Sequence, residues 1–180
     1  MQPKSVFMCS LERFKIDLKG LTEEVTTFEF ELGKDYFNAL DETEVENGAL
    51  HVSLSIRKAS GFFELQFHTV GTVDIPCDRC LDLMEQPIET DNRLVAKFGS
   101  TNSEDDETVI VDEDEGILDT SWYIYEFIAL AIPIQHVHAT GKCNPAMTKA
   151  LEELSADRSG DEESSQTIDP RWEKLKNLNI

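Results

Sequence analysis

The sequence has no long apolar segment. Nowhere in its 180 residues does an apolar run approach the roughly 20 residues that a membrane-spanning helix needs. Residues 1–20 contain neither an apolar stretch of signal-peptide length nor a small-residue cleavage site. We therefore expect a cytoplasmic protein without a membrane segment.

Basic residues are scarce. The chain has 16 Lys and Arg against 36 Asp and Glu, which gives a formal net charge of −20. Such a charge repels a polyphosphate backbone and attracts basic partners. It also keeps a protein soluble whatever its function. The charge therefore argues against a stand-alone nucleic-acid binder, but it does not identify a partner.

Catalytic motifs are absent as well. The chain has no glycine-rich phosphate loop and no Ser, His and Asp in the order of a hydrolase triad. It also lacks an internal repeat. We therefore expect no enzymatic activity.

Alternating apolar and polar residues dominate the chain from Leu11 to Phe98, and this period is typical of half-buried strands. The "KASG" that ends at Gly61 predicts a hairpin loop between two of these strands. Residues 33–42 have the pattern of a short helix. The expected strands cover residues 14–18, 25–32, 49–58, 61–75 and 92–98. Their order predicts an antiparallel meander or a barrel-like sheet.

Helix signals follow the strands. Residues 119–133 begin with potential capping residues, are apolar nearly all round and end at Pro133, which predicts a helix buried on every side. A second, short helix is expected to open with Asn144 as cap and Pro145 at its first position. The sequence therefore predicts an α+β fold: the sheet, a buried helix and short C-terminal helices.

Composition divides the chain into a domain and a tail. Residues 1–154 are expected to form a single α+β domain with an acidic loop at 100–119, in which "TVIV" has the pattern of an edge strand. Residues 155–168 are rich in Ser and acids, which is typical of a flexible linker. Residues 169–180 carry Trp, Leu and basic residues in a pattern that predicts a C-terminal amphipathic helix.

Cys77 and Cys80 form a C-x-x-C motif, and thiolates at this spacing can bind one tetrahedral metal ion. Zinc then needs two further ligands. Cys143 follows a glycine-bearing turn and is the obvious third ligand. His136 and His138 both precede it and would point the same way in an extended strand. We select His138, so the candidate metal ligands are Cys77, Cys80, His138 and Cys143.

Two other interpretations of these thiols stay open. The 57 residues between Cys80 and His138 far exceed the roughly 15 to 20 of a compact zinc ribbon, and free cysteines often sit as small buried hydrophobes. A thioredoxin-like redox pair is the other alternative. Its C-x-x-C should open a helix after a parallel strand, whereas this motif ends an antiparallel meander.

Glu126 is the only charged residue in the apolar run 122–133. A carboxylate on a buried helix needs a partner. Arg79, inside the C-x-x-C motif, is a candidate for that ion pair and would tie the helix to the motif. The alternative is that Glu126 lies at an exposed edge of the helix.

Three stretches together resemble the YceD family, the large ribosomal RNA subunit accumulation proteins. They are "IPCDRCLDLMEQPI", "YEFIALAIPIQHVH" followed by "GKC", and the terminal "DPRWEKLKNL". The resemblance covers roughly Val70 to the C-terminus and, in outline, the strand-rich N-terminal half. In this family, a C-x-x-C, a later His and a closing Cys correspond to the four candidate ligands above, and the family's Arg and helix Glu correspond to Arg79 and Glu126. A structural zinc ion is the expected cofactor.

The resemblance implies a non-enzymatic factor that supports the accumulation of large-subunit, 23S-type ribosomal RNA. Family members are often encoded beside a small basic ribosomal protein of the large subunit. The expected partner is therefore such a protein or a pre-large-subunit particle. An alternative is direct RNA binding through a zinc knuckle and the basic C-terminal helix, which the net charge opposes. A metal-dependent or thiol enzyme is disfavoured because four protein ligands leave no open coordination position.

Overall fold

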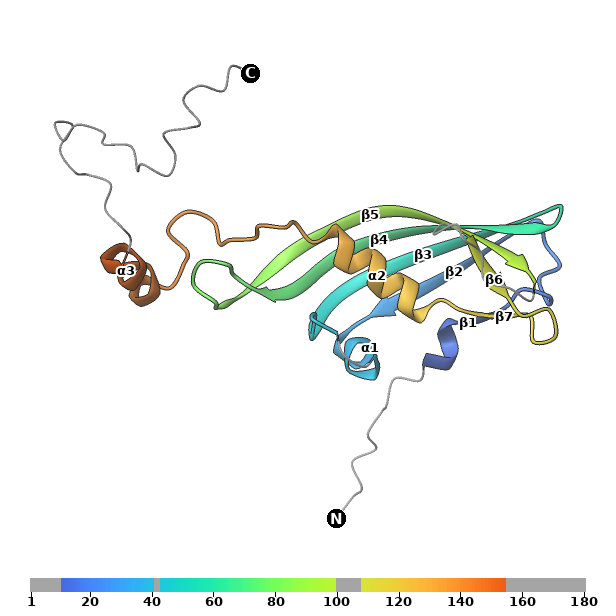
Figure 1. Cartoon of the computed structure of the whole chain (residues 1–180), viewed down its shortest axis with the longest axis horizontal. Helices are drawn as coiled ribbons and strands as arrows, with labels where there is room; N and C mark the ends of the chain where they lie inside the picture. Colours follow the sequence, from blue (N-terminus) through green and yellow to red (C-terminus); the bar gives the residue numbers. More distant parts are fainter. Residues whose placement is uncertain (1–10, 41–42, 100–107, 155–180) are drawn as a thin grey trace, which may run out of the picture.

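A curved five-stranded sheet forms the body of the protein. The computed structural model describes residues 11–40, 43–99 and 108–154. Four strands form an antiparallel meander and a fifth pairs in parallel with the end of the fourth (Figure 1). They are β2 (Val25–Leu32), β3 (Asn47–Ala59), β4 (Phe62–Pro76), β5 (Leu83–Phe98) and β6 (Thr108–Val111). The predicted α+β fold with an antiparallel meander is confirmed, but the strand expected at residues 14–18 is not part of this sheet, and the sheet does not close into a barrel.

The remaining elements are short. The 3-10 helix η1 (Leu11–Phe14) leads into β1 (Lys15–Asp17), which pairs with β7 (Ile117–Asp119) in a separate two-stranded sheet. The helices are α1 (Lys34–Ala39), α2 (Ser121–Ala131) and α3 (Pro145–Leu154). The short helix predicted between the second and third strands is confirmed as α1. The predicted edge strand "TVIV" is confirmed as β6.

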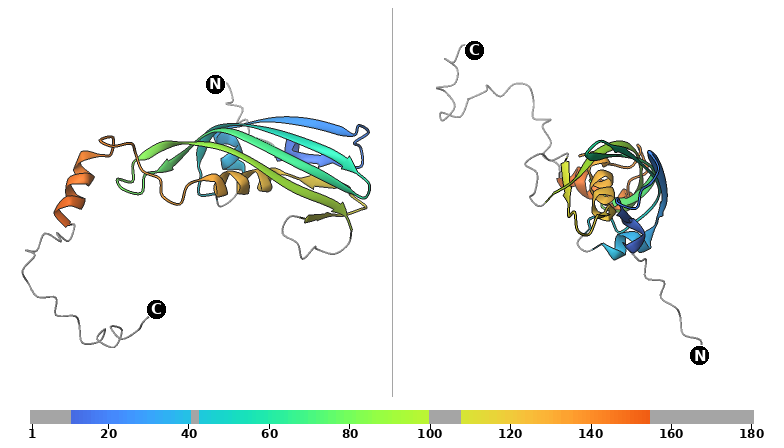
Figure 2. Two further views of the ribbon diagram at one scale, coloured as in Figure 1. Left: turned by 90° about the horizontal axis from the view of Figure 1, so that it is seen from above. Right: turned by 90° about the vertical axis from the view of Figure 1, so that its right-hand side faces the viewer.

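The hydrophobic core lies between the sheet and α2. Alternate residues of β3 are buried on one face, as their period of two requires. Seen along the long axis, the sheet curls around α2 (Figure 2). The Tyr36 hydroxyl donates a 2.7 Å hydrogen bond to the carbonyl oxygen of Ser121, which joins α1 to the start of α2. Sheet and helix thus share one core.

The apolar run of α2 is buried along one face only. Ile124 and Ile128 are fully buried, whereas Trp122 is 49% exposed and Leu130 74% exposed. The prediction of a helix buried on every side was therefore wrong. The sheet covers one side of the helix, and nothing in the described part of the chain covers the other. The N-cap residue Thr120 makes no side-chain capping bond, but the Asp119 carboxylate accepts hydrogen bonds from the amide and hydroxyl of Ser121, the first residue of the helix.

Two glycines fit the geometry of the meander. Gly61 lies in the β3–β4 turn with a φ of 90°, a conformation that a side chain disfavours. At Gly71 a Cβ atom would lie 2.2 Å from the carbonyl oxygen of Ala49 on β3. β5 is longer than predicted and includes Pro87, at a point where β6 does not pair with it. A proline is tolerated there because no ladder hydrogen bond is needed on that side.

The helix α3 is apart from the core. Asn144 caps it as predicted, because its side-chain oxygen accepts a 3.0 Å hydrogen bond from the Ala146 amide. None of its side chains is buried, and its apolar stripe of Met147, Leu151 and Leu154 is exposed. The predicted linker 155–168 and C-terminal helix 169–180 lie outside the described residues, as does part of the predicted acidic loop. No helix in the described ranges is long and apolar enough to cross a membrane.

Candidate metal centre

The turn from Cys77 to Asp82 connects β4 to β5. The Cys77 amide donates to the Asp82 carbonyl at 2.9 Å, and the Leu81 amide donates to the Cys77 carbonyl at 2.8 Å. Leu81 has a φ of 64°, which is uncommon for a residue with a side chain. This tight turn folds the chain back so that both thiols reach one point. We call residues 76–83 the knuckle.

The second half of the site comes from the extended segment that follows α2, and Asp78 holds this segment against the knuckle. The Asp78 amide donates to the His136 carbonyl at 2.9 Å. The Asp78 carboxylate accepts from the His136 amide at 2.7 Å and lies 3.4 Å from the His136 Nε2 atom. His136 is therefore engaged with Asp78.

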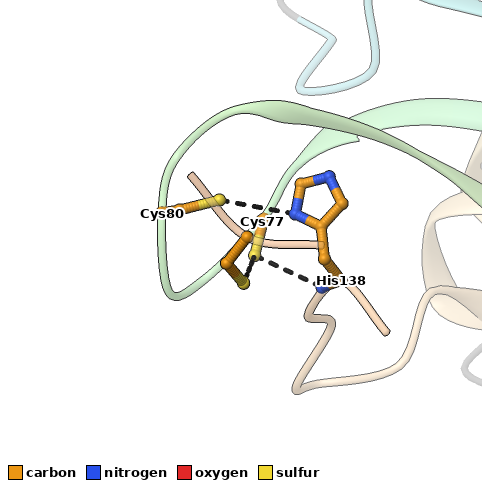
Figure 3. Close-up of side chains that lie close together, drawn as sticks. Cys77, Cys80 and His138 are labelled. Atoms are coloured by element: carbon orange, nitrogen blue, oxygen red, sulfur yellow. Dashed lines mark hydrogen bonds between the residues drawn. The ribbon is translucent and has the colours of Figure 1, made fainter. Parts of the chain in front are cut away.

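Four donor atoms converge between these two segments. The ligand atoms of Cys77, Cys80, His138 and Cys143 all lie within 4.8 Å of one another. The Sγ atoms of Cys77 and Cys143 are 3.9 Å apart, and the Cys80 Sγ lies 3.4 Å from the His138 Nδ1. Figure 3 shows Cys80 and His138 pointing toward each other from the two segments. The structure thus brings together the four predicted ligands and separates His138 from His136.

Two of the donor–donor distances match the edges of a metal tetrahedron. With zinc bond lengths of about 2.3 Å to sulfur and 2.0–2.1 Å to nitrogen, a tetrahedron has S···S edges of about 3.8 Å and S···N edges of about 3.6 Å. The observed 3.9 Å and 3.4 Å are close to these values. The donor set can therefore hold a metal ion without a large rearrangement.

The electrostatics of the site favour a thiolate at Cys77. Burial opposes the charged form, but backbone amides of His138, Cys80 and Arg79 donate toward the sulfur and lower the pKa of the Cys77 thiol from 9.0 to about 6. Burial, with the Cys77 and Cys80 sulfurs next to it, raises the pKa of the Cys143 thiol. A bound metal cation would counteract the raised pKa of Cys143, because cysteine binds a metal as the deprotonated thiolate.

The alternative interpretations of the thiols fit the structure less well. Cys77 and Cys80 are buried, but neither belongs to the hydrophobic core cluster of the described residues. Their sulfurs contact polar groups: Cys77 is next to the Cys143 sulfur and backbone amides, and Cys80 is next to the His138 ring. The C-x-x-C lies between two antiparallel strands and opens no helix, unlike a thioredoxin-type pair. The three described cysteines form no disulfide.

The predicted ion pair between Arg79 and Glu126 is not formed. Glu126 lies on the exposed face of α2, and no salt bridge joins it to Arg79 in the described part of the chain. Arg79 instead lines a small groove with Thr148 and Leu151 of α3. The exposed-edge alternative for Glu126 matches the structure, because the helix is open to solvent on that side.

Asp78 is the functional residue that the sequence interpretation missed. It makes both backbone and side-chain contacts with His136, and the His138 amide two residues later donates to the Cys77 Sγ at 3.4 Å. The available signal was an Asp inside a tight turn, a position where its side chain commonly bonds nearby backbone. That signal does not reveal a partner 58 residues away.

Comparison with known proteins identifies the family. A family model described as "Large ribosomal RNA subunit accumulation protein YceD" matches residues 65–179. Searches of curated proteins and of solved structures gave no significant match. The matched region is more than half of the chain and includes all four candidate ligands and the knuckle. The chain therefore belongs to the YceD family of large ribosomal RNA subunit accumulation proteins.

Proposed function

We propose that this protein is a non-enzymatic ribosome-biogenesis factor of the cytoplasm that binds a basic ribosomal protein of the large subunit, or a pre-large-subunit particle. The family name implies involvement in the accumulation of large-subunit ribosomal RNA. The main observation that supports a basic partner is the net charge of −20. An acidic surface attracts a basic protein and can shield it until it meets RNA.

The distribution of charge on the sheet supports this partner. On the outer face, Arg57 and Arg93 are both paired with the carboxylate of Glu64. Glu85 and Glu89 of β5 are exposed and form no ion pair among the described residues. Two of the scarce cations are thus engaged with one carboxylate, while the carboxylates of Glu85 and Glu89 stay available. This surface suits a cationic partner better than a phosphate backbone.

Affinity capture from cells at low and high salt tests the proposal. The full chain should retain a basic large-subunit protein or pre-large-subunit particles at low salt and release them at high salt, because surface charge interactions are screened. An unrelated acidic protein of similar net charge is the control bait. Retention of neither partner at low salt contradicts the proposal. Tight binding of purified protein to large-subunit RNA fragments at physiological salt would favour direct RNA binding instead.

For the metal centre we propose a structural zinc ion. Three sulfur donors and one imidazole are a common zinc set, and four protein ligands close the site to water and substrate. The fit of the observed distances to a tetrahedron supports this choice. The zinc ion would join the knuckle to the segment after α2, and so hold the two halves of this end of the molecule together.

Metal analysis of the purified protein tests the zinc proposal. Wild type should contain about one zinc ion per chain, as a four-ligand site requires, and Cys77→Ser and Cys143→Ser should contain little. Cys9→Ser is the matched control, because Cys9 is isolated in the sequence and should leave the zinc content unchanged. A well-folded, metal-free wild type would contradict the proposal.

A further inference from the structure

A groove of about 400 Å³ lies beside the knuckle. It is formed where the start of α1, the start of β3, the end of β4 and the start of β5 meet. Its lining residues are Lys34, Glu44, Glu46, Asn47, Asp74, Pro76 and Leu83. The groove shares Pro76 and Leu83 with the knuckle, so a ligand in it would also contact the metal-bearing end of the protein.

One wall of the groove is apolar. Leu83 is 71% exposed, and its neighbour Leu81 at the knuckle tip is 68% exposed. Large aliphatic side chains at this exposure gain free energy when a partner covers them, at about 25 cal/mol per Å² of buried apolar area. The turn holds the backbone of Leu81 in the left-handed region, and this geometry keeps its side chain exposed.

The opposite rim is acidic and fixed in place. Glu44 and Glu46 are exposed and form no ion pair among the described residues. Val45 between them is buried. The Glu44 amide donates a 2.9 Å hydrogen bond to the Tyr125 hydroxyl of α2, which fixes the backbone of this rim. Lys34 is the single cation of the lining. The groove therefore combines an apolar wall with a preformed acidic rim.

Residues 169–180 of the same chain have the complementary chemistry. This segment carries three apolar residues in helical spacing, Trp172, Leu175 and Leu178. It also has three of the chain's 16 basic residues, Arg171, Lys174 and Lys176, and only two acids. In a protein with a net charge of −20, it is a basic, amphipathic exception. Basic amphipathic segments bind grooves that pair apolar and acidic surfaces.

The connection is long enough for this segment to reach the groove. α3 begins at Pro145, two residues after the ligand Cys143, and lies at the knuckle end of the molecule (Figure 1). Its ten residues span about 15 Å. Residues 155–168 follow, and a flexible linker of this length has an end-to-end distance of about 21 Å and a maximum of about 46 Å. The linker can therefore return along α3 to the knuckle.

We propose that residues 169–180 dock in this groove within the same molecule, with Trp172 against the Leu83 wall and the lysines facing Glu44 and Glu46. The groove is then the intramolecular receptor of the chain's own basic tail. This inference does not depend on the ribosomal role, because both the surface and its occupant belong to this chain.

Tryptophan fluorescence of the full chain tests the docking. The chain has two tryptophans, so Trp122→Phe leaves Trp172 as the only reporter. In this background, docking should give blue-shifted emission and weak quenching by acrylamide. Adding Glu44→Lys with Glu46→Lys, or Leu83→Glu, should shift the emission to the red and raise quenching several-fold. All of these positions are exposed, and circular dichroism verifies that each variant is folded.

Two control variants and a dilution experiment make the result specific. Glu113→Lys with Glu115→Lys gives the same charge change in the exposed turn between β6 and β7, and it should leave the Trp172 signal unchanged. The variant with Glu44→Lys and Glu46→Lys should regain protection of Trp172 from acrylamide when Lys174→Glu and Lys176→Glu are added. The two surfaces then attract each other again, with the signs of their charges exchanged. Equal, solvent-like quenching of Trp172 in all variants would overturn the proposal. Protection that disappears on dilution would also overturn it, because the occupant would then be a second copy.

Discussion

The sheet body of this protein and the end that contains the candidate metal centre differ in the contacts that hold them together. In the body, a single cluster of buried apolar side chains joins the sheet to α1 and α2. At the other end, which comprises the knuckle and residues 133–154, α3 buries no side chain and Ile134 is fully exposed. Its two segments meet through four donor atoms and the contacts of Asp78 with His136.

With the proposed zinc ion bound, this chain would divide its stability between apolar burial and metal coordination. A short turn and an extended segment cannot bury enough apolar surface to offset the conformational entropy of ordering them. A metal ion supplies that free energy at one point. The two regions should therefore respond separately to perturbation.

Metal removal should have the largest effect and should be confined to one region. The apparent binding free energy of structural zinc in small domains is about 10–16 kcal/mol. We expect chelation to abolish amide protection in residues 76–83 and 133–144, while β3 and β4 keep theirs. Hydrogen exchange of the full chain with and without chelator measures this. Simultaneous loss of protection in the strands would show that the regions are not separable.

A core substitution should perturb the opposite region. Ile124 is fully buried between α2 and the sheet, so Ile124→Ala should lower the free energy of unfolding by about 2–5 kcal/mol. Leu151→Ala on the exposed stripe of α3 removes a side chain of equal size and should change it by about 0.5 kcal/mol or less. Urea denaturation measures both. Equal destabilisation by the two variants would place α3 in the core.

The two regions also differed in how far the sequence predicted them. The strands of the body follow from alternation, because each needs only its own residues to define a buried face. The pairing of β1 with β7 was not predicted, since 99 residues separate even the partners closest in sequence, Asp17 and Ile117, and neither strand has more than three residues. The alternation at residues 14–18 did predict β1, but the three residues of β7 carry too little periodic signal to identify it as the partner.

At the metal end, the donor types were predicted but the geometry was not. The C-x-x-C and H-x4-C spacings identified Cys77, Cys80, His138 and Cys143. The choice of His138 over His136 became clear only from tertiary contacts, because residues two apart in an extended chain point to the same side. The prediction of an Arg79–Glu126 ion pair was wrong because it, too, depended on tertiary contacts. Sequence indicates which charges need partners, but not which face of α2 is covered.

Asp78→Asn should weaken the metal centre without affecting the body. Its carboxylate accepts from the His136 amide at 2.7 Å, which positions the segment that bears His138. Loss of the charge should reduce zinc affinity about tenfold, the lower end of the effect of outer-shell partners. Competition with a chelating dye measures the affinity. Asp91→Asn is the matched control, because Asp91 pairs with His68 on the sheet at 2.8 Å. Equal weakening by both would contradict a local role.

The smallest predicted effect concerns the charge cluster on the sheet. Hydrogen bonds from Arg57 lower the pKa of the Glu64 carboxyl below its ordinary 4.5, against the opposing effect of burial, and Arg93 adds to the shift. Because the folded-state pKa lies below the unfolded value, Glu64 stabilises the fold above about pH 4.5 and this contribution is lost as the pH falls through the folded pKa. Glu64→Gln should therefore be less stable than wild type at pH 7, with the difference shrinking in acid, while zinc content at pH 7 is unchanged. Urea midpoints measured from pH 7 down to pH 3 report this difference, and Glu85→Gln, at an exposed position on β5, provides the control. A difference that stays constant from pH 7 to pH 3 would mean that Glu64 acts through its shape and not through its charge.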